Sequence, residues 1–243
     1  MKFRECTPLY SEETTESSPF ELDETLIDWV GVAERVTQSP CSPRDDEELW
    51  RTALIRDGFS CTITRQYDVV AMKIPSIEED EILGRGGVLY TTCVQILPDS
   101  DYFEGHLIGN GSPQLTDNAA VVLKVLRNMG YIAQDLKGPG ARSLPNVMTM
   151  TREVYEFFSR LELWFEPTTI KDNYTIQTIH QYIRVPKDCR LSSPNPAFLP
   201  LPSQQYLSLS ATCAKVAHYS GARRYLEELD DVLEDLEGLE LDS

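Results

Sequence analysis

The sequence has few of the groups that usually mark an enzyme or a membrane protein. It has three histidines in 243 residues, and no apolar run approaches the roughly 18–20 residues that a membrane helix needs. The first residues include Lys2 and Arg4 with no apolar segment behind them, a pattern that argues against a secretory signal. We therefore expect an intracellular protein, cytoplasmic or nuclear, with no membrane contact.

Motifs with a known chemical mechanism are also missing. The six cysteines are scattered without a CxxC pair, which is typical of reduced thiols and unlike a disulfide framework or a structural zinc site. The sequence contains no HExxH, no GxSxG and no GxxxxGK[ST]. Composition therefore indicates a globular domain but does not indicate which reaction or ligand it serves.

Positive charge is scarce, since the formal net charge is -17. Acidic residues gather at the two ends: residues 1–24 hold seven of them and residues 223–243 hold nine. Phosphate backbones are held chiefly by Lys and Arg, so this balance argues mildly against tight nucleic-acid binding. A local basic patch at Arg142, Arg152 and Arg160 remains a candidate nucleic-acid contact.

Three regions follow from these patterns. Residues 1–24 are rich in Ser, Thr and Glu and are expected to be disordered. Residues 25–222 are expected to form the folded domain. Residues 223–243 predict an acidic amphipathic helix with leucines at helical spacing, which either docks on its own domain or binds a basic or hydrophobic protein partner.

Within the domain, the patterns predict a mixed α+β fold. Helices are expected over 25–38, after Pro43 up to Asp57, and over 204–219; a further helix is expected to begin at Thr116 or Asp117. Strands are expected at 59–64, 67–74 and 88–97, and a hairpin is expected to join 161–167 to a long strand at 174–185.

The stretch 144–166 (LPNVMTMTREVYEFFSRLELWFE) is the part around which the rest is organised. Its apolar residues recur in steps of three and four from Val147 to Phe165, which predicts one apolar stripe on a helix. Pro167 is expected to close the far end.

Several pieces read together resemble a known family. They are LWRTALIRDGFSCTITRQYD, TTCVQILPDS, the 144–166 stretch and LPLPSQQYLSLSATCAKVAHYSGA, which occur in this order. They resemble the fungal family of HNH-nuclease-domain proteins over about residues 47–240. That family has an Arg-Asp-Gly-aromatic-x-Cys entry, a strand ending in His-Ile-Leu-Pro, an Asn loop, a His-bearing helix and a Trp-x-Glu-Pro stretch.

The resemblance implies an HNH-like ββα-metal finger, in which two strands and a helix hold one divalent ion, embedded in a mainly helical domain with added strands. It implies metal-dependent phosphodiester hydrolysis of nucleic acid. The strand histidine would deprotonate water, the metal would stabilise the developing phosphate charge, the helix histidine would hold the metal, and the asparagine would fix the loop by hydrogen bonding.

Carried onto this sequence, the strand histidine falls on Gln95, the asparagine on Asn146 and the helix histidine on Tyr155. An amide is no general base near neutral pH, and a neutral phenol is a poor ligand for Mg²⁺, Mn²⁺ or Zn²⁺. Ser159 stands where the family has aspartate after the helix, and Arg65 stands where it has glycine. The resemblance thus implies a nuclease scaffold with an impaired site.

Three hypotheses remain open at this stage. The first is a degenerate HNH-type domain that has become a pseudoenzyme or a binding module. The second is an active nuclease whose metal has moved to neighbouring groups, for which the candidates are Asp99, Asp101, Glu104 and His106. The third is a non-catalytic protein-interaction module that uses the acidic C-terminal helix.

Overall fold

The structure, a computed structural model, describes residues 28–39, 43–97 and 140–220. The segments predicted as a disordered N-terminus (1–24), as a helix beginning at Thr116 or Asp117 and as an acidic C-terminal helix (223–243) lie outside these residues. Within them the chain forms helices and small sheets, so its mixed α+β character is confirmed.

Two helices open the described chain, as predicted. Helix α1 (Trp29–Gln38) begins where the Asp28 side chain accepts from the Gly31 amide, and α2 (Asp46–Arg56) begins where Asp45 accepts from Glu48. A carboxylate at these positions satisfies an otherwise unpaired helix-start amide. The two helices pack through apolar residues that include Trp29 and Leu49, forming the core cluster that we call the α2-side cluster.

The segment after α2 differs from its prediction. Residues 59–64 form turns with one isolated bridge, Ser60 to Tyr67, and the predicted strand there is wrong. Gly58 and Phe59 both have positive φ, which turns the chain sharply and breaks an extended run. The predicted extended run at 67–74 shrinks to β1 (Tyr67–Asp68), which leads into the 3-10 helix η2 (Val69–Lys73). Helix α3 (Glu79–Gly84) and β2 (Val88–Leu89) follow, and β2 pairs parallel with β1.

The centre of the fold is an antiparallel pair made by β3 (Thr91–Gln95) and β4 (Val147–Thr151). The single helix predicted from Val147 to Phe165 is therefore wrong, because its first five residues are strand. All five residues of β4 are buried, since both faces of the pair are covered. A strand buried on both sides loses the alternation that would identify it, so apolar residues at other spacings imitate a helix.

Only the middle of that stretch is helical. Helix α6 (Arg152–Ser159) starts directly after β4, and Leu161, at φ +59°, turns the chain into β5 (Leu163–Pro167). The predicted hairpin is confirmed, since β5 pairs antiparallel with β6 (Asn173–Thr178). Strand β6 ends at Thr178 rather than near Val185, and β7 (Asp188–Arg190) pairs with its other edge.

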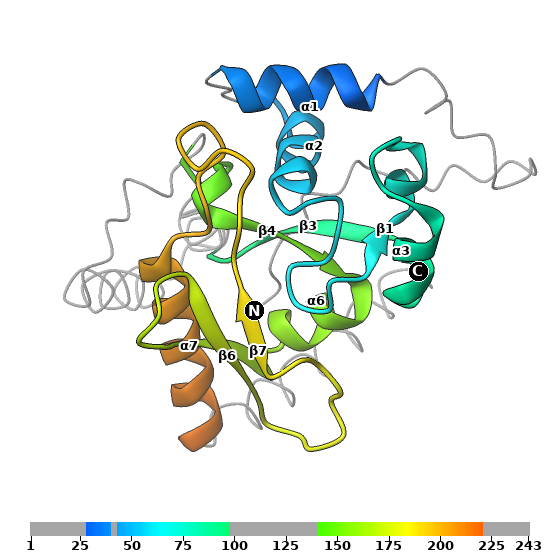
Figure 1. Cartoon of the computed structure of the whole chain (residues 1–243). Helices are drawn as coiled ribbons and strands as arrows, with labels where there is room; N and C mark the ends of the chain where they lie inside the picture. The colour runs from blue at the N-terminus through cyan, green and yellow to red at the C-terminus, as the bar shows by residue number, and fades with distance from the viewer. Residues whose placement is uncertain (1–27, 40–42, 98–139, 221–243) are drawn as a thin grey trace, which may run out of the picture.

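The β3–β4 pair separates two regions of the core. Figure 1 shows α1 and α2 on one side of the pair, and α6 with the β5–β6–β7 sheet on the other. Cys93 and Val147 belong to the α2-side cluster. Val94, Met148 and Met150 belong to the other cluster, which includes Phe158 and residues of β5 to β7 and which we call the α6-side cluster. Side chains alternate between the two faces of a strand, so each residue's face follows from its register.

The last described helix, α7 (Gln204–Tyr219), agrees with the prediction for 204–219. It packs on β5, where Trp164 contacts Ala211 and Ala214 in a small third cluster. Lys215 of α7 also pairs with Glu166 of β5. Helix α7 thus covers the face of the β5–β6–β7 sheet that points away from α6.

Candidate functional site

Asn146 is the last residue of the 3-10 helix η4 (Leu144–Asn146), directly before β4, and it is fully buried. Its Oδ1 accepts from the Leu97 amide at 3.1 Å, and its Nδ2 donates to the carbonyls of Leu97 and Ala141, both at 2.9 Å. Its own carbonyl accepts from the Ile96 amide at 2.8 Å. One side chain therefore joins the end of β3 to the loop that leads into β4.

Gln95 and Tyr155 lie on different faces of the β3–β4 pair. Gln95 pairs with Val147 and so faces the α2-side cluster, where it is 5% exposed. Tyr155, on α6, is partly buried and packs against the α6-side cluster. The structure places Asn146 beside the strand end that carries Gln95, but it does not bring the side chains of Gln95 and Tyr155 toward each other.

The donor groups at these positions do not suit a divalent ion. Gln95 offers an amide and Tyr155 a phenol, whereas the metals implied by the resemblance prefer carboxylate or imidazole ligands. Within residues 28–39, 43–97 and 140–220, no three His, Cys, Asp or Glu side chains are grouped so that they could hold a metal. The alternative ligands Asp99, Asp101, Glu104 and His106 lie outside these residues.

The three candidate nucleic-acid arginines are exposed but do not form one patch. Arg142 precedes β4 and pairs with Asp46 at 3.4 Å, while Arg152 follows β4 and pairs with Glu156 at 3.4 Å. The whole of β4, a strand about 17 Å long, lies between them in the chain. Arg160 ends α6. Two of the three positive charges are thus partly neutralised by neighbouring acids.

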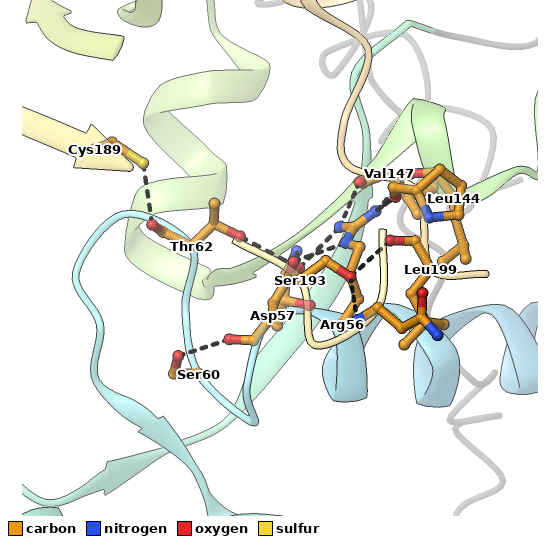
Figure 2. A network of polar contacts seen from close by, with 12 residues as sticks. Arg56, Asp57, Ser60, Thr62, Leu144, Val147, Cys189, Ser193 and Leu199 are labelled. Atoms are coloured by element: carbon orange, nitrogen blue, oxygen red, sulfur yellow. Dashed lines mark hydrogen bonds and ion pairs between the residues drawn. The ribbon is translucent and has the colours of Figure 1, made fainter. Parts of the chain in front are cut away.

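The sequence reasoning gave no role to a buried ion pair that lies at the centre of the molecule. Arg56 Nε donates to Asp57 Oδ1 at 2.8 Å and Arg56 Nη2 donates to Asp57 Oδ2 at 2.9 Å, with the two side chains 0% and 4% exposed. Arg56 also donates to the carbonyls of Leu144 at 2.6 Å and Val147 at 2.9 Å. These contacts appear together in Figure 2.

Asp57 extends the same network toward β4. Its Oδ2 accepts from the Thr149 amide at 3.0 Å and from the Thr62 hydroxyl at 3.4 Å. The Thr62 carbonyl in turn accepts from the Cys189 thiol at 3.2 Å (Figure 2). The sequence could have indicated this ion pair, since Arg56 and Asp57 stand at the end of an apolar helix. Two adjacent charged side chains are buried in a core only when each has a partner for its charge and hydrogen bonds.

Thiol chemistry has little support at three of the four described cysteines, the exception being Cys213 of α7, which is exposed. Cys61, Cys93 and Cys189 are buried, and burial raises the pKa of the Cys189 thiol to about 12. A thiol acts as a nucleophile or a metal ligand through its thiolate, so Cys189 is unreactive at neutral pH.

Comparison with known proteins adds no relative: no family model, no curated protein and no solved structure matches this chain. No helix in the described part of the chain is both long and apolar enough to span a bilayer.

Proposed function

We propose that β3, β4 and α6 form the ββα unit of a degenerate HNH-type domain that binds nucleic acid without hydrolysing it. The observation that carries this proposal is the Asn146 side chain, which joins the end of β3 to the loop before β4. The resemblance gives the family asparagine this same task of fixing the loop by hydrogen bonds. The order of the elements, two antiparallel strands followed directly by a helix, agrees with it.

The Arg-Asp-Gly entry motif supplies a second support. The resemblance uses this motif only as a sequence signature. In this chain it lies about 90 residues before the loop that contains Asn146. In the fold, Arg56 and Asp57 bond to Leu144, Val147 and Thr149, which surround Asn146 in the chain. Two motifs that are distant in sequence thus meet in one buried network.

Arg65 supplies a third support. It stands where the family pattern has glycine, and its φ is +61°, in the left-handed region that favours glycine. An arginine at such a φ costs of order 1 kcal/mol. The backbone here has the conformation for which a glycine would be suited.

The absence of hydrolysis in this proposal follows from the groups at positions 95 and 155. Neither an amide nor a neutral phenol removes a proton from water near neutral pH, and the two side chains face different core clusters. The proposed module therefore lacks the base and the metal ligand, and it also departs from the family geometry, in which both positions surround one ion.

The test is a cleavage and metal-binding assay on the full chain. Incubation with supercoiled plasmid and with single-stranded RNA, in Mg²⁺, Mn²⁺ or Zn²⁺, is expected to give no products above a metal-free control. Calorimetry with the same ions is expected to show no binding. Restoring both histidines (Gln95→His with Tyr155→His) is expected to leave both results unchanged, because these positions do not face each other.

Cleavage that a chelator abolishes and that Asn146→Ala removes would overturn the proposal in favour of an active nuclease with a displaced metal site. A gain of metal binding in the double variant would contradict the placement of the two positions on separate faces.

A further inference from the structure

The loop between β6 and β7, residues 179–187, is fixed to the fold at several points. Ile179 packs in the third cluster, and its amide donates to the Glu162 carbonyl at 3.0 Å. Ile183 is 7% exposed, and its amide donates to the His180 carbonyl at 3.2 Å. The Lys187 carbonyl accepts from Ile176 at 2.6 Å. The loop therefore has a defined shape with its aliphatic side chains turned inward.

The outward side chains of the same loop carry an aromatic pair. The rings of His180 and Tyr182 stack with centroids 4.7 Å apart and planes 12° apart. Tyr182 is 70% exposed. A tyrosine ring this open in a folded domain presents apolar area to solvent, and here it lies nearly parallel to the neighbouring imidazole. The pair is a flat surface on which another planar ring can stack.

Two cations flank this pair of rings. Arg184 and Lys187 are exposed, and neither makes an ion pair in the described part of the chain. The nearest acid along the chain is Asp188, the first residue of β7, and residues 179–187 themselves contain none. By contrast, Arg142 and Arg152 each pair with an acid. In a chain with a net charge of -17, two unpaired cations beside a stacked aromatic pair form a locally positive surface.

We propose that the loop 179–187 is a contact site for single-stranded nucleic acid, with a base stacked on the His180–Tyr182 pair and phosphates held by Arg184 and Lys187. Base stacking on aromatic rings together with cations along the backbone is the general chemistry of single-strand binding. Duplex bases are already stacked on each other, so a single strand fits better than a duplex. The chemistry does not distinguish RNA from DNA.

This inference rests on the proposed function only for the class of ligand, because the loop and the β3–β4–α6 unit are separate elements. The two can fail separately. The metal-binding and cleavage assay tests the function proposed for the β3–β4–α6 unit. Substitutions at Tyr182, Arg184 and Lys187 test the binding of nucleic acid by the loop.

The test is fluorescence anisotropy of the full chain with labelled 15-nucleotide oligo-dT, oligo-U and a duplex of the same length, at several salt concentrations. We expect both single strands to bind more tightly than the duplex. Tyr182→Ala is expected to weaken single-strand binding about 5- to 150-fold, the range for loss of one stacked base. Arg184→Gln with Lys187→Gln is expected to make the negative slope of log K against log salt shallower by about 1.4.

Two matched controls accompany these variants. Tyr219→Ala removes an equally open tyrosine, 77% exposed and beside His218 at the end of α7, and is expected to change affinity less than twofold. Arg35→Gln with Lys171→Gln removes the same charge from two exposed positions, one in α1 and one between β5 and β6, and is expected to cost less affinity than the loop pair. Circular dichroism of each variant verifies its fold.

Three results would overturn the proposal. The first is tighter binding of the duplex than of either single strand. The second is equal loss from Tyr182→Ala and Tyr219→Ala. The third is that neither oligonucleotide binds, while a synthetic peptide of residues 223–243 binds and Tyr182→Ala weakens its binding. The loop would then be a binding site for the acidic C-terminal segment.

Discussion

Asn146 satisfies three backbone groups with one amide, and it does so in a fully buried place. The Leu97 carbonyl and the Ala141 carbonyl both need a donor there. A buried carbonyl that loses its donor keeps the desolvation penalty without compensation. This position therefore tolerates an amide and few other groups.

Asn146→Asp is expected to lower the free energy of unfolding by about 3 kcal/mol, because a carboxylate would face two carbonyl oxygens in the core. Urea denaturation followed by circular dichroism measures it. Gln177→Glu, the same chemical change at an exposed position of β6, is the control and is expected to change stability by less than about 0.5 kcal/mol. Equal costs for the two substitutions would show that Asn146 is not the clamp described here.

At the scale of elements, the Arg56–Asp57 pair joins the end of α2 to η4 and β4. The guanidinium has acceptors on three sides, and the carboxylate receives donors from Arg56, Thr149 and Thr62. Breaking a buried pair by removing one partner leaves an uncompensated charge in the core. Helix α2 would then lose its hydrogen bonds to β4, and the remaining charged side chain would be buried without a partner.

Arg56→Met is expected to cost about 3–5 kcal/mol, since it leaves the Asp57 carboxylate buried without its partner. Chemical denaturation of the full chain gives the value. Arg152→Met removes an arginine of similar length from an exposed pair whose side chains are 87% and 49% exposed, and it is expected to cost less than about 0.5 kcal/mol. A small cost for Arg56→Met would mean that Asp57 is satisfied without it.

For the molecule as a whole, both large clusters share the β3–β4 pair. The α2-side cluster contains Trp29, and the third cluster, beside the α6-side cluster, contains Trp164. The two indoles are 2% and 6% exposed, so each reports on its own part of the core. A shared pair of strands couples the two regions, because neither can lose its packing without uncovering one face of β3 and β4.

We therefore expect a single cooperative unfolding transition. Trp50 packs beside Trp29 on the α2-side cluster, so Trp29→Phe with Trp50→Phe removes the fluorescence of that region, and Trp164→Phe removes that of the other. These substitutions conserve most of the buried volume. Each variant should show the same urea midpoint by tryptophan fluorescence and by circular dichroism. Different midpoints for the two probes within one variant would mean that the regions on either side of β3–β4 unfold separately.

Local signals in the sequence determined several elements of this protein. Helices α1, α2 and α7 follow from apolar periodicity, and α1 and α2 also have capping carboxylates. The β5–β6 hairpin follows from two extended runs joined by a short segment, and all of these signals act within a few residues. The mixed α+β class follows from the same local patterns. The resemblance identified Asn146 as a residue of interest, and the structure shows that its side chain is buried and hydrogen-bonded.

Tertiary structure alone decided the centre. Val147–Thr151 became a strand because Thr91–Gln95 lies beside it and both faces are covered, a circumstance that removes the alternation a sequence would display. The faces of Gln95 and Tyr155 depend on strand register, and the partners of Arg56 come from residues about 90 positions away. Long-range pairing of this kind has no local signature, so only the folded chain determines it.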